Sequence, residues 1–359
     1  MIIVKRGLVV MKSFTSAFPL INLWVRLLFL TFTFLCLPAC DVNNNDDDKL
    51  PPCPPFQIIS TPPYDSPVWH PSGDFIGFNH TSLLKINYPY GEHCQGVYEW
   101  DPQQSGFWLT NTDGTNMRRI FPYKLQNPAW SPDGEWIAFV LPLGGERHIY
   151  KMRFTGETFD TTTLVQLTTE GRNFVPSWSP DGQWIAYNRS ICNGPQTCGI
   201  WVMTKDGNNN RFLSSYGNYP EWYSSNNLFY LTRAVDNTGN AVGDTLWDFT
   251  LNMNLKQKIS FLKGSNRNIK YLKNKNVIVY CSDGNLWTMD STGNNQKKLT
   301  FETVDNDFGL PFSCSWVDDK IVYTKYHPNN WTYENGTLWI LDLTTGEKRQ
   351  LTFNPKPNN

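Results

Sequence analysis

The chain has 359 residues, with 31 lysine and arginine residues against 32 aspartate and glutamate residues. This balance, together with the absence of a basic stripe in the sequence, argues against a nucleic-acid partner. A closed all-β array commonly takes up about 250 residues as one domain, so the length fits a single large domain. We therefore expect one domain whose partner is a protein, a sugar or a small molecule.

Residues 1–40 have the pattern of an export signal. Four basic residues precede an apolar run, residues 27–37, which is closed by Pro38, Ala39 and Cys40. The run is shorter than the stretch of about 20 residues that a membrane span requires. A basic flank and a small residue before a cleavage point are typical of a secretory signal. The sequence therefore predicts that the protein leaves the cytoplasm.

Leu37-Pro38-Ala39-Cys40 resembles the lipobox of bacterial lipoproteins, whose cysteine becomes the acylated first residue of the mature chain. Pro38 departs from the small or aliphatic residue usual at its position. The resemblance implies that lipid on Cys40 anchors the protein to a bilayer in the bacterial cell envelope, on the periplasmic or surface side. An uncleaved signal anchor is the alternative. Residues 41–55 are rich in Asn, Asp and Pro, a composition that predicts a flexible tether.

Six repeats follow in residues 56–354, and residues 355–359 form a tail. The repeats open at intervals of 44 to 61 residues, at Trp69, Trp130, Trp178, Trp222, Tyr271 and Trp316. This period suits propeller blades of about 40–50 residues. In each repeat the next strand carries an aliphatic and an aromatic residue on one face: Ile76/Phe78, Ile137/Phe139, Ile185/Tyr187, Leu228/Tyr230, Ile278/Tyr280 and Ile321/Tyr323. The pattern predicts an all-β fold, a six-bladed β-propeller of four-stranded antiparallel blades.

The strands of each blade are called A to D here, from the axis outward. The C strands are centred on aromatic residues, namely Trp108, Tyr150, Trp201, Trp247, Trp287 and Trp339. The D strands end on aliphatic residues, namely Ile120, Leu167, Leu213, Ile259, Leu299 and Leu351. Between A and B, the second and third repeats carry Ser-Pro-Asp-Gly, in which each residue type favours a tight turn.

The repeats resemble the TolB-type, WD40-like propeller repeat. The resemblance lies in the motif Trp-Ser-Pro-Asp-Gly-x-x-Ile-Ala-Phe/Tyr, followed by a Trp-centred strand and a terminal Leu-Thr. The resemblance covers residues 56–354 and is weakest in the fifth repeat, where Tyr271 replaces the tryptophan. It implies a propeller fold over these residues, and a membrane tether joined to a rigid ring without catalytic motifs favours a protein-binding role in the cell envelope. In TolB an α/β domain precedes the propeller, whereas the short polar segment 41–55 occupies that place here.

One strand remains at the N-terminal end of the repeats. Residues 56–60 have the character of a D strand, and Arg349–Thr352 has the same character in the sixth repeat. We expect residues 56–60 to join the sixth blade and close the ring, because mixing the two ends of the chain removes free edges. Which of the two segments is outermost stays open.

Six cysteines remain once Cys36 in the signal and the lipidation candidate Cys40 are set aside. In an exported protein these cysteines meet an oxidising environment. Cys192 and Cys198 bracket a Gly-Pro loop and are the best disulfide candidates. Cys53 could pair with Cys94. We expect Cys281 and Cys314, which fall in or beside strands, to be buried thiols.

Function is expected where the loops vary. The A–B and C–D turns of a propeller share one face and are short here, whereas the B–C and D–A loops on the other face vary in length, and binding residues gather on such loops. Loop aromatics of the first and sixth blades are therefore the candidate partner- or ligand-binding residues: Tyr88, Tyr90, Tyr98, Trp100, Tyr326, His327, Trp331 and Tyr333. The alternative is that these aromatics form a small core of the long loop itself.

Catalysis has little support in the sequence. We expect His70 and His148 to be structural, and the sequence carries no Gly-x-Ser-x-Gly motif and no carboxylate at metal-ligand spacing beside His80, His93 and His327. We predict no catalytic residues, no metal and no cofactor. The favoured function is a non-enzymatic scaffold for an envelope protein. A propeller that binds or cleaves glycans, or one that serves in structural assembly, are the alternatives, because fold alone does not choose a function.

Overall fold

A computed structural model describes residues 53, 63–91, 94, 97–190, 197–301, 311–325 and 336–353, with the backbone alone at residues 86, 98 and 143. The chain divides into two units, residues 1–51 and 52–359, and every described residue belongs to the second. The predicted signal, Cys40, residues 56–60 and nearly all of the predicted tether lie outside the described residues. Within the described part, no helix is long and apolar enough to cross a bilayer.

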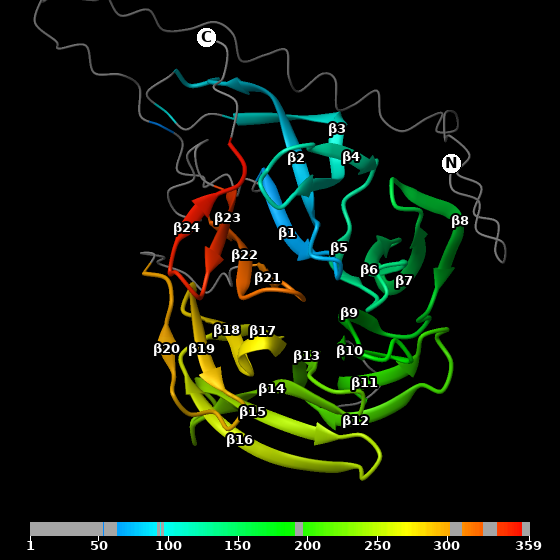
Figure 1. Cartoon of the computed structure of the whole chain (residues 1–359), viewed down its shortest axis with the longest axis vertical. Helices are drawn as coiled ribbons and strands as arrows, with labels where there is room; N and C mark the ends of the chain where they lie inside the picture. The colour runs from blue at the N-terminus through cyan, green and yellow to red at the C-terminus, as the bar shows by residue number, and fades with distance from the viewer. Residues whose placement is uncertain are drawn as a thin grey trace, which may run out of the picture. The chain divides into compact units, whose positions relative to one another are not determined.

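The described residues form six four-stranded antiparallel sheets, each made of consecutive strands (Figure 1). The first blade comprises β1 (Tyr64–Trp69), β2 (Phe75–Asn87), β3 (Val97–Asn111) and β4 (Arg118–Phe121). The second comprises β5 (Gln126–Trp130), β6 (Trp136–Leu143), β7 (Glu146–Phe154) and β8 (Phe159–Gln166). The third comprises β9 (Arg172–Trp178), β10 (Trp184–Ser190), β11 (Gly199–Thr204) and β12 (Arg211–Ser215).

The other three blades follow the same order. The fourth comprises β13 (Gly217–Trp222), β14 (Asn227–Val235), β15 (Ala241–Thr250) and β16 (Leu255–Lys263). The fifth comprises β17 (Asn266–Leu272), the 3-10 helix η1 (Lys273–Lys275), β18 (Val277–Ser282), β19 (Asn285–Asp290) and β20 (Lys297–Lys298). The sixth comprises β21 (Phe312–Cys314), β22 (Lys320–Lys325), β23 (Thr337–Asp342) and β24 (Lys348–Gln350). The predicted six-bladed β-propeller is confirmed.

The inner strands form a closed ring around the axis. Each of β1, β5, β9, β13, β17 and β21 contacts the next, and β21 contacts β1. Apolar side chains of neighbouring blades pack together in six core clusters. The predicted B-strand and C-strand aromatics are direct cross-strand partners in all six blades, from Phe78 opposite Trp108 to Tyr323 opposite Trp339. These pairs place two aromatic side chains opposite each other in every blade, and the rings of Phe139 and Tyr150 and of Tyr280 and Trp287 stack.

The opening residue of the sixth repeat is different from the one predicted. In the first blade Trp69 lies opposite Ile76, and in the sixth blade Cys314 lies opposite the equivalent Ile321. Trp316 follows the end of β21 and is 42% exposed. The prediction that Trp316 opens this repeat was therefore wrong by two residues. The interval of seven residues from Trp69 to Ile76 equals that from Cys314 to Ile321. The equivalence of Cys314 to the tryptophans was not apparent from the sequence because a cysteine stands where the other repeats have an aromatic residue.

The Ser-Pro-Asp-Gly turns are held by their own side chains. In the second blade the Ser131 hydroxyl accepts a hydrogen bond from the Trp136 amide at 2.9 Å and donates to the Asp133 carboxylate, which also accepts from the Glu135 amide at 3.0 Å. Gly134 has a φ of 72°, which favours glycine. Ser179 accepts from the Trp184 amide at 2.9 Å in the third blade. These four residue types therefore serve the hairpin rather than a ligand.

The Leu-Thr pairs at the ends of the D strands also have a structural role. The hydroxyls of Thr168, Thr300 and Thr352 each accept a hydrogen bond at 2.9 Å from a C-strand amide, those of Ile149, Leu286 and Leu338 respectively. All three threonines are buried. Each hydroxyl takes the place of a backbone carbonyl as the hydrogen-bond acceptor for a buried C-strand amide. Without the hydroxyl, that amide would have no hydrogen-bond partner.

His70 takes the place of the turn serine in the first blade. Its Nδ1 lies 2.9 Å from the Ser72 hydroxyl, and its Nε2 donates to the Gly134 carbonyl oxygen of the next blade at 3.2 Å. The ring meets Trp130 edge to face at 4.9 Å. His70 is buried, and this burial lowers its pKa from the ordinary value of 6.5. The expected structural role is confirmed.

We expect His70 to make the propeller less stable in acid. Because the pKa of His70 is lower in the folded protein than in the unfolded chain, the unfolded chain takes up its proton first, and stability falls as the pH drops through 6.5. His70→Ser, which restores the serine of the second and third turns, should reduce that fall. Thermal unfolding of both proteins between neutral and mildly acidic pH measures the difference, and parallel pH curves would contradict it.

The ring closes through side-chain packing and hydrogen bonds between the first and sixth blades. Tyr64 and Trp69 pack with Leu338 and Ile340 in one core cluster. The Trp69 amide donates to the Ser313 hydroxyl at 3.1 Å, and the Tyr64 amide donates to the Gly336 carbonyl at 3.2 Å. In the described ranges the sixth sheet consists of residues from its own repeat alone. The expected closure by residues 56–60 lies outside the described residues and stays a prediction.

Five of the inner strands contain the same bulge. Three residues before the aromatic position, a residue other than glycine adopts a positive φ of 48–55°: Ser66, Asn127, Val175, Tyr219 and Asn268. Register with the B strand shifts at each of these sites. Proline follows in four blades, as Pro67, Pro128, Pro176 and Pro220. A repeated backbone irregularity of this kind is a designed feature of the sheet edge.

Candidate binding face

The B–C and D–A loops form one face of the propeller, called the loop face here, and the A–B and C–D turns form the opposite turn face. On the loop face the B–C hairpin of the first blade is the longest described projection. Its strands pair as far as Asn87 opposite Val97, with register shifts beyond His80 and Leu83. Residues 82–91 and 97–105, called the blade-one hairpin, therefore extend past the end of the other sheets (Figure 1).

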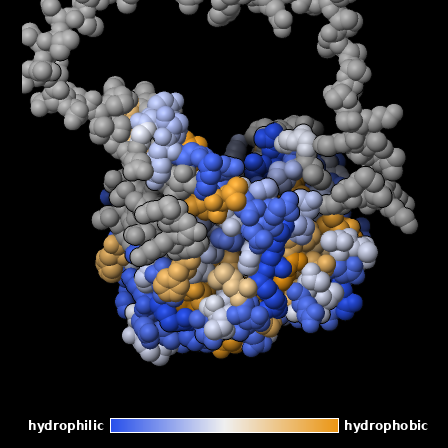
Figure 2. All heavy atoms as spheres, turned by 90° about the horizontal axis from the view of Figure 1, so that it is seen from above, coloured by the Kyte–Doolittle hydropathy of each residue, from blue (hydrophilic) through white to orange (hydrophobic). Residues whose placement is uncertain are grey.

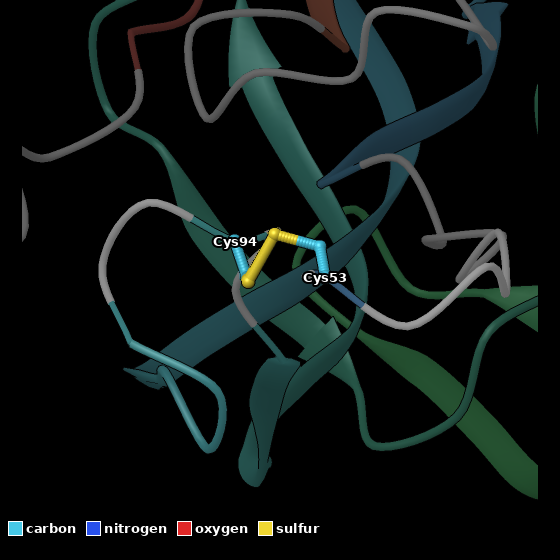
Figure 3. The surroundings of a disulfide bond; sticks show 2 residues. All are labelled: Cys53 and Cys94. Carbon is cyan, nitrogen blue, oxygen red and sulfur yellow. A yellow bond between two sulfur atoms is a disulfide. The ribbon is translucent and has the colours of Figure 1, made fainter. Parts of the chain in front are cut away.

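A disulfide holds the tip of the blade-one hairpin. Cys53 and Cys94 are bonded, with their Cα atoms 5.4 Å apart (Figure 3). The pairing of these two cysteines is thereby confirmed. It joins the chain that precedes the propeller to the loop face. Cys281 and Cys314 are buried thiols, also as predicted. Cys192 lies outside the described residues, so its bond to Cys198 stays a prediction.

The candidate aromatics of the first blade all lie on the blade-one hairpin. Tyr88 and Tyr90 are 44% and 46% exposed at its tip. Trp100 is partly buried and lies opposite Leu83 in the strand register. The backbone of Tyr98 lies opposite Ile86. Tyr88 and Tyr90 are thus available for contact, whereas Trp100 also supports the hairpin, a combination of the two roles that the sequence left open.

The candidates of the sixth blade, Tyr326, His327, Trp331 and Tyr333, lie outside the described residues, and so does His93. Their convergence with the blade-one hairpin stays a prediction. His80 has structural contacts: its ring stacks on Tyr64 at 4.5 Å and its Nδ1 donates to the Pro63 carbonyl at 2.8 Å. Among the described residues, no group of three His, Cys, Asp or Glu side chains could hold a metal ion.

A set of exposed aromatics on the loop face was missed by the sequence reasoning. These residues, called the aromatic rim, lie two or three positions after the aliphatic residue of a D strand, in five of the six blades: Tyr123, Tyr216, Phe261, Phe301 and Phe353. Their spacing from the D-strand aliphatic was a usable signal. Apolar side chains interrupt a largely hydrophilic surface in side view (Figure 2).

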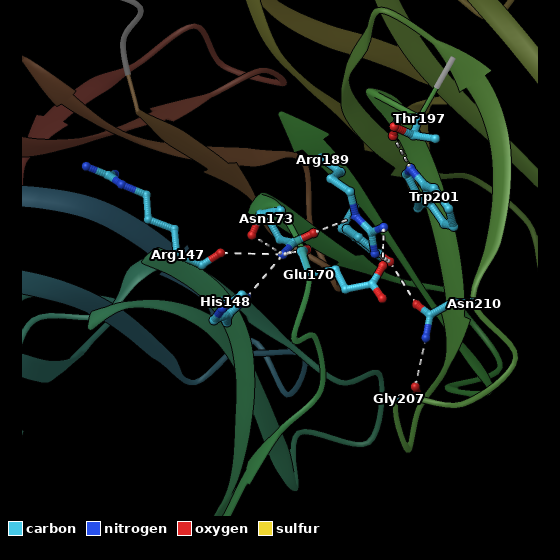
Figure 4. Close-up of polar contacts among 11 residues, drawn as sticks. Arg147, His148, Glu170, Asn173, Arg189, Thr197, Trp201, Gly207 and Asn210 are labelled. Atoms are coloured by element: carbon cyan, nitrogen blue, oxygen red, sulfur yellow. Dashed lines mark hydrogen bonds and ion pairs between the residues drawn. The ribbon is translucent and has the colours of Figure 1, made fainter. Parts of the chain in front are cut away.

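A polar network on this face lies between the second and third blades (Figure 4). Arg189 is buried. Its Nε donates a hydrogen bond to Asn173 Oδ1 at 3.2 Å, and its Nη2 donates one to the Tyr187 hydroxyl at 3.2 Å. Its Nη1 lies 3.6 Å from Glu170 Oε2. The guanidinium also stacks over Trp201, with its centre 4.1 Å from a ring centroid. Burial raises the pKa of Tyr187 to about 12. These partners belong to the third blade and to the loop that precedes it, so the guanidinium has a structural role there rather than presenting an anion site.

His148 lies at the edge of the Arg189 network. Its Nδ1 is 3.4 Å from Asn173 Nδ2, which donates to the Glu170 carbonyl at 2.9 Å. Burial lowers the pKa of His148. Asn266 repeats the role of Asn173 in the fifth blade, where its Nδ2 donates to the Leu262 and Gly264 carbonyls at 3.1 Å. Asn173 and Asn266 thus cap equivalent D–A loops in two blades and are structural, and the contact of His148 with Asn173 agrees with a structural role for His148.

Comparison with known proteins gives a likeness of fold. No family model matches the sequence, and no curated protein is significantly similar to it. TolB from Acinetobacter baumannii superposes with a TM-score of 0.57 at 16% identity, covering 80% of this chain and 65% of that one. A putative TolB from Agrobacterium tumefaciens gives 0.52 at 17% identity, over 66% and 84% of the two chains. A chain of a nidogen/laminin complex gives 0.50 at 11% identity, over 70% and 90%.

The likeness to these structures is one of fold. The chain spans less than two thirds of the length of the Acinetobacter TolB. The presence of TolB proteins among similar structures agrees with the resemblance of the repeats to the TolB type. At 11–17% sequence identity these comparisons show a similarity of fold and not of function. The residues of the loop face itself are therefore the evidence for what this chain binds.

Proposed function

We propose that the protein is an envelope lipoprotein, anchored to a membrane through Cys40, whose propeller is a non-enzymatic scaffold that binds a protein partner on the loop face. The observation that carries this proposal is the blade-one hairpin. It projects from a rigid ring, a disulfide fixes its tip, and it presents Tyr88 and Tyr90 to solvent. Tyrosine supplies a large contact area with a polar end and loses little entropy on binding, which suits protein recognition.

Capture of a partner tests the face. The full-length protein should be crosslinked in its native envelope and the bound proteins quantified. Tyr88→Ala combined with Tyr90→Ala should lower recovery of a defined partner by about tenfold or more, as expected for a pair of aromatic contact residues. Trp316→Ala is the matched control, because Trp316 has a similar exposed fraction on the turn face. Equal recovery with both variants would remove the hairpin from the binding surface.

The anchor has a separate test. Mass spectrometry of the mature protein should find Cys40 as the first residue, carrying lipid chains. Cys40→Ala should abolish this modification and release the protein from the membrane, because buried methylene groups supply the attachment. An unmodified Cys40 in the wild-type protein would refute the lipid anchor and leave the propeller proposal to the capture experiment.

A further inference from the structure

Exposed aromatic side chains are distributed unequally between the two faces of the propeller. Eight of the described aromatic residues are well exposed. Seven of them lie on the loop face, namely Tyr88, Tyr90 and the aromatic rim, and Trp316 is the one on the turn face. Scattered apolar residues are normal on a protein surface, but a one-sided set that recurs from blade to blade indicates an interaction surface.

The aromatic rim also has a defined chemistry. Its members are tyrosine and phenylalanine, carried at the outer ends of the D strands of blades one, three, four, five and six. Phe301 is 74% exposed, and the Lys298 ammonium lies 5.3 Å from its ring centroid. Lys263 is exposed at the end of the D strand that carries Phe261. Aromatic rings beside lysine are the side chains that favour the interface between water and lipid headgroups.

The disulfide determines to which face of the propeller the anchored segment is attached. Cys94 lies in the B–C loop of the first blade, so Cys53 is bound to the loop face. Thirteen peptide steps separate Cys53 from Cys40. At about 3.5 Å per residue they span at most about 45 Å. A lipid on Cys40 therefore keeps the propeller within that distance of the bilayer, with the point of attachment on the aromatic side.

We propose that the aromatic rim rests in the headgroup region of the bilayer that holds the anchor, so that the loop face points toward this membrane. The inference rests on the proposed lipidation of Cys40. It adds a second, weaker membrane contact to the lipid chains, one that orients the propeller. A protein that contacts the blade-one hairpin is then one at the surface of the same membrane.

Lipid-borne quenchers test the orientation. The full-length lipidated protein is labelled with bimane at Phe301→Cys or Tyr216→Cys on the rim, or at Met253→Cys on the turn face, and reconstituted into phosphatidylcholine and phosphatidylglycerol vesicles carrying nitroxide headgroups. Met253 is the matched control, because it is 72% exposed in the C–D turn of the fourth blade. Flotation of the vesicles reports the anchor independently.

We expect loss of bimane emission at both rim positions and unchanged emission at position 253. Unquenched rim probes on protein that floats would overturn the membrane-facing rim while leaving the lipid anchor intact, and would assign the rim to a protein partner instead. Equal quenching at all three positions would show that the propeller has no fixed orientation, which also overturns the inference. Protein that fails to float, with Cys40 unmodified, would refute the anchor and the rim contact together.

Discussion

Replacing Trp69 with alanine is expected to lower the free energy of unfolding by about 3–5 kcal/mol, whereas the same change at Trp316 should cost less than about 0.5 kcal/mol. Trp69 is fully buried where the first and sixth blades meet, and its indole donates to the Gly73 carbonyl at 3.3 Å. Its removal leaves a cavity at the closure of the ring. Urea-induced unfolding, followed by a probe other than tryptophan fluorescence, measures both variants.

The comparison tests the register of the sixth blade. If Trp316 held the position that its sequence context suggests, the two alanine variants would lose similar stability. Trp130→Ala, at the same position in the second blade, is the control for a correctly assigned tryptophan, since it is also buried. A large loss at Trp316 would contradict the placement of Cys314 opposite Ile321.

Removing the disulfide is expected to lower the free energy of unfolding by about 2–4 kcal/mol, because the bond restricts the unfolded chain over a separation of 41 residues. The loop it closes contains all of β1 and β2, so the loss should affect the whole first blade rather than the hairpin alone. Cys53→Ser in the full-length protein is the simplest variant. Chemical denaturation gives the stability, and hydrogen exchange at residues 97–101 reports the hairpin.

Cys94→Ser and the double variant are the controls, and both should match Cys53→Ser, because each variant removes the same bond. A stability equal to that of the wild-type protein, with unchanged hydrogen exchange in the hairpin, would show that the hairpin is held by its strand pairing alone. A loss in Cys53→Ser that the double variant does not share would indicate an effect of the remaining thiol rather than of the disulfide.

The architecture was predictable because its determinants are local. Each blade repeats an A–B turn and a pair of aromatics on the adjacent B and C strands, and residues such as Phe139 and Tyr150 are direct partners once the hairpin forms. The sixth blade was misaligned because Cys314 replaces the tryptophan while Trp316 stands two residues later. A buried thiol fills less volume than an indole, so only the spacing to Ile321 retained the signal.

The residues of the loop face were predictable in part. Tyr88 and Tyr90 were placed in the B–C loop of the first blade, where they are exposed, and the pairing of Cys53 with Cys94 was one of the possibilities that the sequence left open. The aromatic rim was missed because residues such as Phe301 and Phe353 follow a Leu-Thr pair that reads as the end of a packed strand. Their exposure depends on where the D strand leaves the sheet, which is set by the buried hydroxyls of Thr300 and Thr352.

The bulges of the inner strands limit what can enter the axis of the ring. An inner strand is the edge of its sheet, and such an edge ordinarily invites an extended peptide to pair with it. Here the backbone turns away at each bulge, and in four blades the next residue is a proline without an amide hydrogen. At these bulges a segment of a partner is hindered from adding itself as a further strand. Any ligand there would be recognised by side chains, and the ring is protected from the edge-to-edge aggregation that threatens an exposed sheet.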